Sequence, residues 1–135
     1  MRVAVTGAGG FVGAPLVRCL LANGCDVAAL VRSPAALDTF ADVRHRLTCI
    51  TGDLRSDAVG RALELFRPDA CIHAAWYAVP GRYQHGIENL DSVVATASLL
   101  KPLTRTTCRR FVMIGTCAQY QPVEDSLTES QIVRS

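Results

Sequence analysis

The hydrophobic pattern of this chain changes repeatedly between two periods. Short runs that are apolar at nearly every position alternate with longer segments in which apolar residues recur every three or four positions. Continuously apolar short runs are typical of strands buried on both faces, whereas the second pattern is typical of helices with one buried face. The runs that predict strands are 2–6, 26–31, 47–51, 69–75 and 110–115.

Helices are predicted between these runs. The first follows Gly13 and ends at Asn23 and Gly24; others are expected over 56–66 and from about 83 to 100. The polar stretch after Pro34 could hold a short helix. Strands that alternate with helices predict an α/β doubly wound parallel sheet of about five strands in the order 3-2-1-4-5. A ligand crevice is expected where the order reverses, between the first and fourth strands.

A glycine-dense turn lies directly after the first predicted strand. Gly7, Gly10 and Gly13 give the spacing GxxGxxG. Such glycines allow a tight turn, close approach of the backbone to a pyrophosphate, and close packing of helix on strand. The N–H groups at the helix start, with the helix dipole behind them, favour an anion. We expect Gly7, Gly10, Phe11, Val12 and Gly13 to contact a dinucleotide; a glycine-rich turn without a ligand is the alternative.

The ends of the second and third predicted strands carry charged residues. Arg32 follows the second strand at the place where a carboxylate would bind a ribose hydroxyl and an arginine would attract a 2′-phosphate. We therefore expect NADP(H), with NAD(H) as the alternative cofactor and a solvated arginine as the alternative role. Asp53 and Leu54 follow the third strand, where the aspartate could accept a hydrogen bond from the adenine amino group. Capping of the next helix is the alternative for Asp53, although Ser56 could also do this.

The fourth predicted strand ends in small residues. His73 has apolar neighbours and is expected to be a hydrogen-bonded core residue rather than a base. Ala74 and Ala75 would let a cofactor lie close to the backbone. Trp76 and Tyr77 follow, and would either wall the site or pack on the next helix.

Composition narrows the class of protein. The 135 residues are 50% hydrophobic and 19% charged, which is typical of one well-buried domain. We assign residues 1–120 to this domain and residues 121–135 to a loop or frayed tail. The net charge is only +2 and the basic residues are dispersed, so we expect neither nucleic acid nor an anionic membrane as a binding partner. Six cysteines without CxxC spacing predict no metal site and a reduced, cytoplasmic setting. We expect neither a signal peptide nor a membrane span.

Five ordered motifs together resemble the extended short-chain dehydrogenase/reductase family, and within it the NAD(P)-dependent epimerase/dehydratase group that acts on nucleotide sugars. They are TGAGGFVG at 6–13, GDL at 52–54, HAAW at 73–76, Asn89, and RFVMIGTCAQY at 110–120. The resemblance covers roughly residues 1 to 125. It implies a Rossmann fold and hydride transfer at a sugar carbon, with a catalytic Ser or Thr and a YxxxK motif. Thr116 matches the Ser/Thr position; a strand-terminal threonine bonded to backbone is the alternative.

The chain departs from the family pattern at the remaining catalytic residues. The residues four positions after its three tyrosines are Gly81, Ile87 and Glu124, and its only lysine is Lys101. No YxxxK is present, so no tyrosine acid with a lysine beside it can be named. The family's sixth strand and C-terminal substrate lobe are also expected to be absent.

Three interpretations of the chain follow. The first is the cofactor-binding part of a nucleotide-sugar epimerase, dehydratase or reductase, inactive by itself. The second is an NADP(H)-binding regulatory or partner-dependent module, and the third is an inert folded remnant. A sheet that ends at its fifth strand would leave an apolar edge, so we expect a homo-oligomer.

Overall fold

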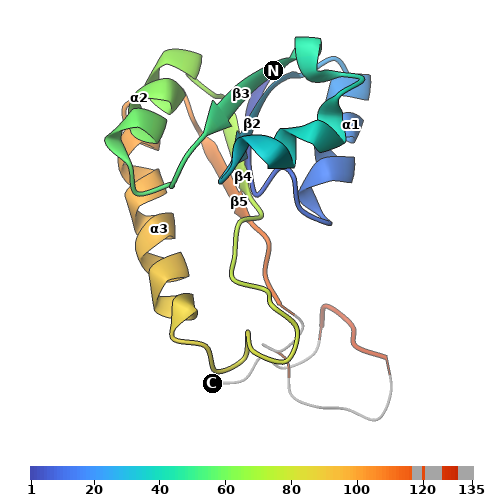
Figure 1. Ribbon diagram of the computed structural model, residues 1–135, viewed down its shortest axis with the longest axis vertical. Helices are drawn as coiled ribbons and strands as arrows, with labels where there is room; N and C mark the ends of the chain where they lie inside the picture. Colours follow the sequence, from blue (N-terminus) through green and yellow to red (C-terminus); the bar gives the residue numbers. More distant parts are fainter. Residues whose placement is uncertain (117–119, 121–125, 131–135) are drawn as a thin grey trace.

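The computed structural model describes residues 1–116, 120 and 126–130, and within them the chain forms a three-layer α/β fold (Figure 1). The five strands are parallel and ordered β3-β2-β1-β4-β5, which confirms the predicted fold class and strand order. In chain order the elements are β1 (Arg2–Thr6), α1 (Gly13–Ala22), β2 (Asp26–Val31), the 3₁₀ helices η1 (Pro34–Phe40) and η2 (Arg44–Arg46), β3 (Leu47–Thr51), α2 (Asp57–Phe66), β4 (Ala70–His73), α3 (Glu88–Leu103) and β5 (Arg110–Met113).

Two hydrophobic cores lie on opposite faces of the sheet. Alternate residues of β1 and β2 enter each core, because successive strand side chains point to opposite faces. Val3 and Val5 pack with α1 and η1, whereas Ala4 packs with α2 and α3. The continuous apolar pattern of these strands therefore reflects helices on both sides, as the sequence predicts. Figure 1 shows α1 on one side of the sheet, with α2 and α3 on the other.

The start of the long helix was predicted too early. α3 begins at Glu88 rather than near residue 83, because the preceding backbone closes on itself in a turn. The N–H groups of Arg82 and Tyr83 both donate to Val79 O, at 3.1 and 3.0 Å. Asn89 then donates its side-chain amide to Tyr83 O at 2.6 Å. The carbonyl that would belong to an earlier helical turn is thus bonded to a side chain.

The end of α3 was predicted too early as well. The helix continues past residue 100 to Leu103 and holds Pro102 in its last turn. Proline removes a helical hydrogen bond and clashes with the preceding turn in a helix interior, so the sequence favours an earlier end. Pro102 is buried against α2 beside Gly60, where a Cβ would lie 3.7 Å from the proline ring. This packing offsets the unfavourable helical position.

The remaining boundaries differ by one or two residues. β4 ends at His73 and β5 at Met113, so Ala74 and Ala75 belong to the following loop rather than to the strand. α2 begins at Asp57, and the hydroxyl of Ser56 accepts from Val59 N–H at 3.3 Å. Ser56 is therefore the N-cap of α2, and the capping role considered for Asp53 is wrong.

A buried polar network joins β1, β4 and α3. His73 is 2% exposed, which confirms it as a hydrogen-bonded core residue. Thr6 Oγ1 accepts from Ala75 N–H at 3.3 Å, which leaves its hydroxyl proton for His73 Nδ1 at 2.7 Å. Thr96 donates to Ser92 O at 2.8 Å and accepts at its Oγ1 from His73 Nε2 at 2.9 Å. These directions match a neutral imidazole that carries its proton on Nε2.

None of the helices formed by the described residues is both long enough and apolar enough to cross a bilayer.

The burial of His73 predicts a pH-dependent stability. Burial lowers the pKa of His73 below its ordinary value of 6.5, so the unfolded chain binds this proton more readily than the folded one. The free energy of unfolding should therefore fall as the pH drops below about 6.5. Urea unfolding between about pH 7.5 and 5.5 should show a smaller loss of stability in His73→Gln than in the wild type.

The exposed His45 supplies the matched control. His45→Gln should keep the wild-type pH dependence. Equal slopes for His73→Gln and the wild type would contradict this account of the network.

Candidate functional site

A cavity of about 870 Å³ lies at the carboxyl ends of the central strands, where the sheet order reverses between β1 and β4. Its volume falls in the range of sites for small molecules and cofactors. All ten residues predicted to bind a cofactor line it. These are Gly7, Gly10, Phe11, Val12, Gly13, Arg32, Asp53, Leu54, Ala74 and Ala75. The fold thus brings them together, while their role in binding stays a prediction.

The floor of the cavity is a close contact between the glycine turn and the loop after β4. Gly7 adopts a φ of 63°, and a Cβ on it would lie 2.8 Å from the backbone of Ala74 and Ala75. A Cβ on Gly13 would overlap Gly7 O. Both positions therefore require glycine, for backbone conformation at Gly7 and for space at both.

The turn presents unpaired backbone donors at the start of α1. Gly10 N–H donates to Gly7 O at 2.9 Å, which closes the turn. Within the described part of the chain, the N–H groups of Phe11, Val12 and Gly13 have no acceptor, and no side chain caps α1. Unpaired N–H groups at a helix N-terminus, next to a cavity, suit a phosphate or another anion.

Arg32 is the unpaired cation at the rim. It is exposed and follows β2, and within the described residues it makes no hydrogen bond or ion pair. By contrast, Arg18 is paired with Asp42 at 2.8 Å, away from the cavity. Arg32 is nevertheless close enough to Asp53 to help lower the pKa of that carboxyl. A free guanidinium at this rim can bind a further anionic group.

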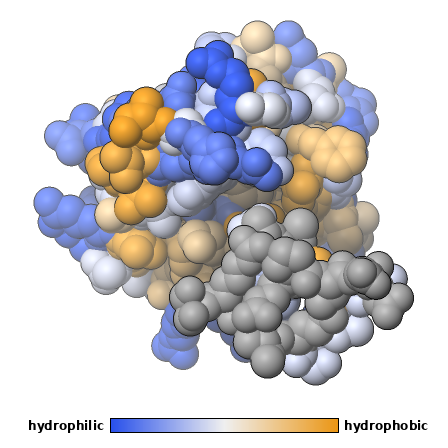
Figure 2. Space-filling view, turned by 90° about the horizontal axis from the view of Figure 1, so that it is seen from below, coloured by the Kyte–Doolittle hydropathy of each residue, from blue (hydrophilic) through white to orange (hydrophobic). Residues whose placement is uncertain are grey.

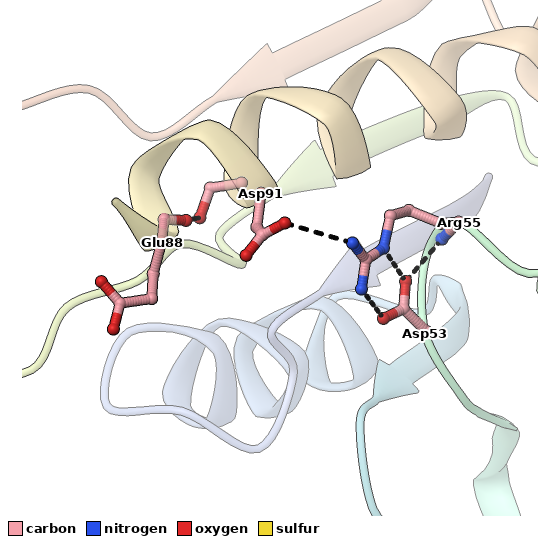
Figure 3. A network of polar contacts seen from close by, with 5 residues as sticks. Asp53, Arg55, Glu88 and Asp91 are labelled. Atoms are coloured by element: carbon pink, nitrogen blue, oxygen red, sulfur yellow. Dashed lines mark hydrogen bonds and ion pairs between the residues drawn. The ribbon is translucent and has the colours of Figure 1, made fainter. Parts of the chain in front are cut away.

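A second arginine is bound to the carboxylate at the end of β3. Arg55 forms a bidentate ion pair with Asp53, with Nη2 2.8 Å from Oδ2, and reaches Asp91 on α3 at 3.3 Å. The hydrogen bonds from Arg55 hold the pKa of Asp53 at about 2. Figure 3 shows Arg55 between the two aspartates, with Glu88 on the first turn of α3 pointing away from it.

The loop after β4 forms the wall toward α3. Trp76 Nε1 donates to Asn89 Oδ1 at 3.0 Å, and Tyr77 N–H donates to Ser92 Oγ at 3.3 Å. Trp76 and Tyr77 also line the cavity. The two alternatives for these aromatic residues are therefore both realised, because they wall the site while bonded to the next helix.

Several residues that line the cavity were not predicted from the sequence. Arg55 was missed, although its position two residues after Asp53 is the available signal. The first turns of α3 were missed because the helix start was misplaced; they contribute Glu88, Asp91, Ser92 and Ala95.

Thr116 is not among the residues that line the cavity. It is exposed and follows β5, three residues after Met113. Its assignment as the catalytic hydroxyl stays a prediction. The predicted loop or tail is described only at 126–130, which are exposed coil and turn; the rest of it lies outside the described residues.

Comparison with known proteins gives a family match. The pattern of the NAD dependent epimerase/dehydratase family matches residues 3–134. Among curated proteins, the chain is 35% identical over 131 residues to an uncharacterized protein of Mycobacterium tuberculosis. That match covers 96% of this chain, and the chain spans only 14% of that relative's length.

Solved structures agree with the fold. The Thermus thermophilus UDP-glucose 4-epimerase in complex with NAD is 26% identical with a TM-score of 0.78, over 99% of this chain and 44% of the enzyme. The Bifidobacterium longum UDP-glucose 4-epimerase in complex with NAD⁺ and UDP is 26% identical with a TM-score of 0.84. The match covers 99% of this chain and 43% of that enzyme. The chain thus spans less than half of each of these structures.

Two glycines in helices offer a matched test of the turn. Gly13→Ala places a methyl group on Gly7 O, so we expect a loss of stability of about 1–3 kcal/mol, as for overpacking. Gly60→Ala meets only Pro102 at an ordinary contact distance, so it should be neutral or stabilise by up to about 1 kcal/mol. Urea unfolding measures both. A neutral Gly13→Ala would show that the turn is not held in this conformation.

Proposed function

The chain belongs to the NAD dependent epimerase/dehydratase family, and we propose that its cavity binds NADP(H), as the cofactor-binding part of a nucleotide-sugar epimerase, dehydratase or reductase. The observation that carries this proposal is the set of three unpaired N–H groups beside the close contact of Gly7 with Ala74 and Ala75. Those donors suit the pyrophosphate. The two UDP-glucose 4-epimerases with NAD support a nicotinamide dinucleotide.

The two ends of the cofactor are assigned by charge. Asp53 would accept from the adenine amino group, with Leu54 beside it, and Arg32 would pair with a 2′-phosphate of the adenosine ribose. The lack of an ion pair on Arg32 among the described residues supports NADP(H) as the cofactor, because its guanidinium can bind the 2′-phosphate without first breaking another ion pair. NAD(H) is the alternative.

The chemistry is proposed on the family alone. A bound nicotinamide cofactor would supply hydride transfer to or from a sugar carbon. Thr116 would orient the reacting hydroxyl or carbonyl of a nucleotide sugar and stabilise charge on its oxygen. Because the sequence has no YxxxK motif, we propose that these 135 residues by themselves bind the cofactor but do not turn over substrate. Residues 1–120 form the binding domain in this proposal, and a cytoplasmic setting suits the free thiols of its described cysteines.

A second candidate is a cofactor-binding regulatory or partner-dependent module. The missing YxxxK motif favours it, because binding residues are present without the tyrosine acid. Turnover of a nucleotide sugar by the chain alone would exclude this candidate and also contradict the proposed inactivity.

The proposed partner for assembly is a second copy of the chain. Apolar side chains are exposed along α3 and β5, including Leu90 at 61%, Val93 at 53% and Met113 at 53%. Figure 2, which views the molecule from below, shows hydrophobic patches exposed beside hydrophilic side chains. Exposed apolar side chains on α3 and β5 favour association.

Arg32 gives the test of cofactor preference. We expect the wild type to bind NADPH more tightly than NADH, and Arg32→Ala to weaken NADPH binding by about 10- to 100-fold, as for loss of a charged hydrogen bond. NADH binding should change by less than about twofold. Fluorescence titration of both cofactors measures this.

Arg61→Ala is the matched control, because Arg61 is exposed on α2 and does not line the cavity. Tighter binding of NADH by about tenfold in the wild type would overturn the role given to Arg32. Binding of neither cofactor would overturn the proposed function and favour an inert remnant.

The self-association has its own test. Sedimentation of the wild type should show a species larger than the 14.5 kDa monomer. Leu90→Glu with Val94→Lys should shift it toward the monomer, because charges on α3 disfavour burial of this face. Leu65→Glu is the control, since Leu65 is exposed on α2 at 82%. A stable wild-type monomer would contradict self-association.

A further inference from the structure

Arg55 uses most of the hydrogen-bonding capacity of Asp53. Its backbone N–H and Nε donate to Asp53 Oδ1 at 2.8 and 3.0 Å, and its Nη2 donates to Oδ2 at 2.8 Å. Its Nη1 reaches Asp91 Oδ1 at 3.3 Å, so the guanidinium is held from α3 as well (Figure 3). A carboxylate oxygen has two lone pairs. Oδ1 is therefore filled, and Oδ2 keeps one acceptor position in a carboxylate that lines the cavity.

We propose that Arg55 is a positioning residue that sets base selectivity, holding Asp53 as a fixed hydrogen-bond acceptor so that the cavity takes a 6-aminopurine dinucleotide and rejects a 6-oxopurine one. This inference rests on the proposed function, because it requires that the adenosine end of a dinucleotide lies at Asp53. Arg55 acts through Asp53 and does not itself contact the base.

The neighbouring backbone completes the pattern. Leu54 lines the cavity, and within the described residues its N–H has no acceptor. Asp53 and Leu54 thus supply an acceptor and an unpaired donor at consecutive residues of the cavity lining. Adenine offers a donor at its 6-amino group and an acceptor at N1, which matches this order. Hypoxanthine offers an acceptor at O6 and a donor at N1–H. O6 would then face the carboxylate acceptor of Asp53, and N1–H would face the N–H donor of Leu54, so neither hydrogen bond could form.

A carboxyl that could rotate would lose this discrimination, because its free acceptor position would no longer be held toward the 6-amino group. Arg55 prevents this change, since three hydrogen bonds fix the orientation of Asp53.

The two arginines at this end of the cavity then have separate tasks. Arg55 is paired with two carboxylates, whereas Arg32 is unpaired among the described residues. Arg32 should therefore respond to the 2′-phosphate and Arg55 to the base. Four ligands separate these effects: NAD⁺, NADP⁺ and the corresponding nicotinamide hypoxanthine dinucleotides without and with the 2′-phosphate.

Isothermal titration of these four ligands tests the inference. The wild type should prefer adenine over hypoxanthine by at least about tenfold, the value of one good hydrogen bond to a charged group. Arg55→Met should reduce this ratio to about threefold or less and leave the effect of the 2′-phosphate unchanged. Arg32→Ala should leave the adenine-to-hypoxanthine ratio unchanged and reduce the effect of the 2′-phosphate. Arg61→Met, on the exposed face of α2, should keep both ratios.

A double-mutant cycle shows whether Arg55 acts through Asp53. In an Asp53→Ala background, Arg55→Met should have no further effect on the base ratio. Should Arg55→Met fail to fold, as judged by circular dichroism, Arg55→Lys carries the test. A single ammonium cannot reproduce the planar two-oxygen pairing, so its ratio should lie between those of the wild type and Asp53→Ala.

The outcomes separate the two proposals. Binding of no dinucleotide by the wild type would overturn the proposed function and this inference together. Dinucleotide binding with equal affinity for both bases would overturn only this inference. An adenine preference that survives Arg55→Met, or Arg55→Lys in its place, would also overturn it.

Discussion

The backbone of the glycine turn passes so close to the end of β4 that a side chain on Gly7 would collide with Ala74 and Ala75. This contact brings the ends of β1 and β4 together at the point where the strand order reverses. Thr6 and His73, the last residues of those strands, are buried and bonded to each other beside it. The cavity and the polar part of the core therefore depend on the same pair of strand ends.

Charge is distributed unevenly around this contact. The unpaired N–H groups at the start of α1 give one end of the cavity a positive character that needs no ionised side chain. At the ends of β2 and β3, the charge of Arg55 is offset by Asp53 and Asp91, whereas that of Arg32 is not offset by any ion pair in the described part. Formal charge alone would treat the two arginines alike. Their partners make one a support for a carboxylate and leave the other available to an anion.

The sequence predicted the strands and their order because helices cover both faces of the sheet, so each buried strand is apolar throughout. It failed where tertiary contacts override local preference. Pro102 stays helical because it packs beside Gly60, and α3 starts late because Asn89 binds the carbonyls of the preceding loop. Arg55 is a different case. Its ion pair with Asp53 joins residues two positions apart and could have been predicted, whereas its contact with Asp91 joins residues 36 positions apart, which no local pattern reveals.

The residues proposed for cofactor binding and the residue proposed for chemistry lie on parts of the fold that differ in burial. Most of the proposed binding residues follow β1, β2 and β4, whose central residues are buried between the two cores. Asp53 and Leu54 follow β3, at the edge of the sheet opposite to β5. Thr116 follows β5, one of the two edge strands of the described sheet, where Val112 and Met113 are half exposed. Contacts that cover β5 would therefore change the surroundings of Thr116 far more than those of Gly7 or Asp53. Association at that edge would act on the residue proposed for the chemistry, while the cavity keeps its geometry through contacts already made within the sheet.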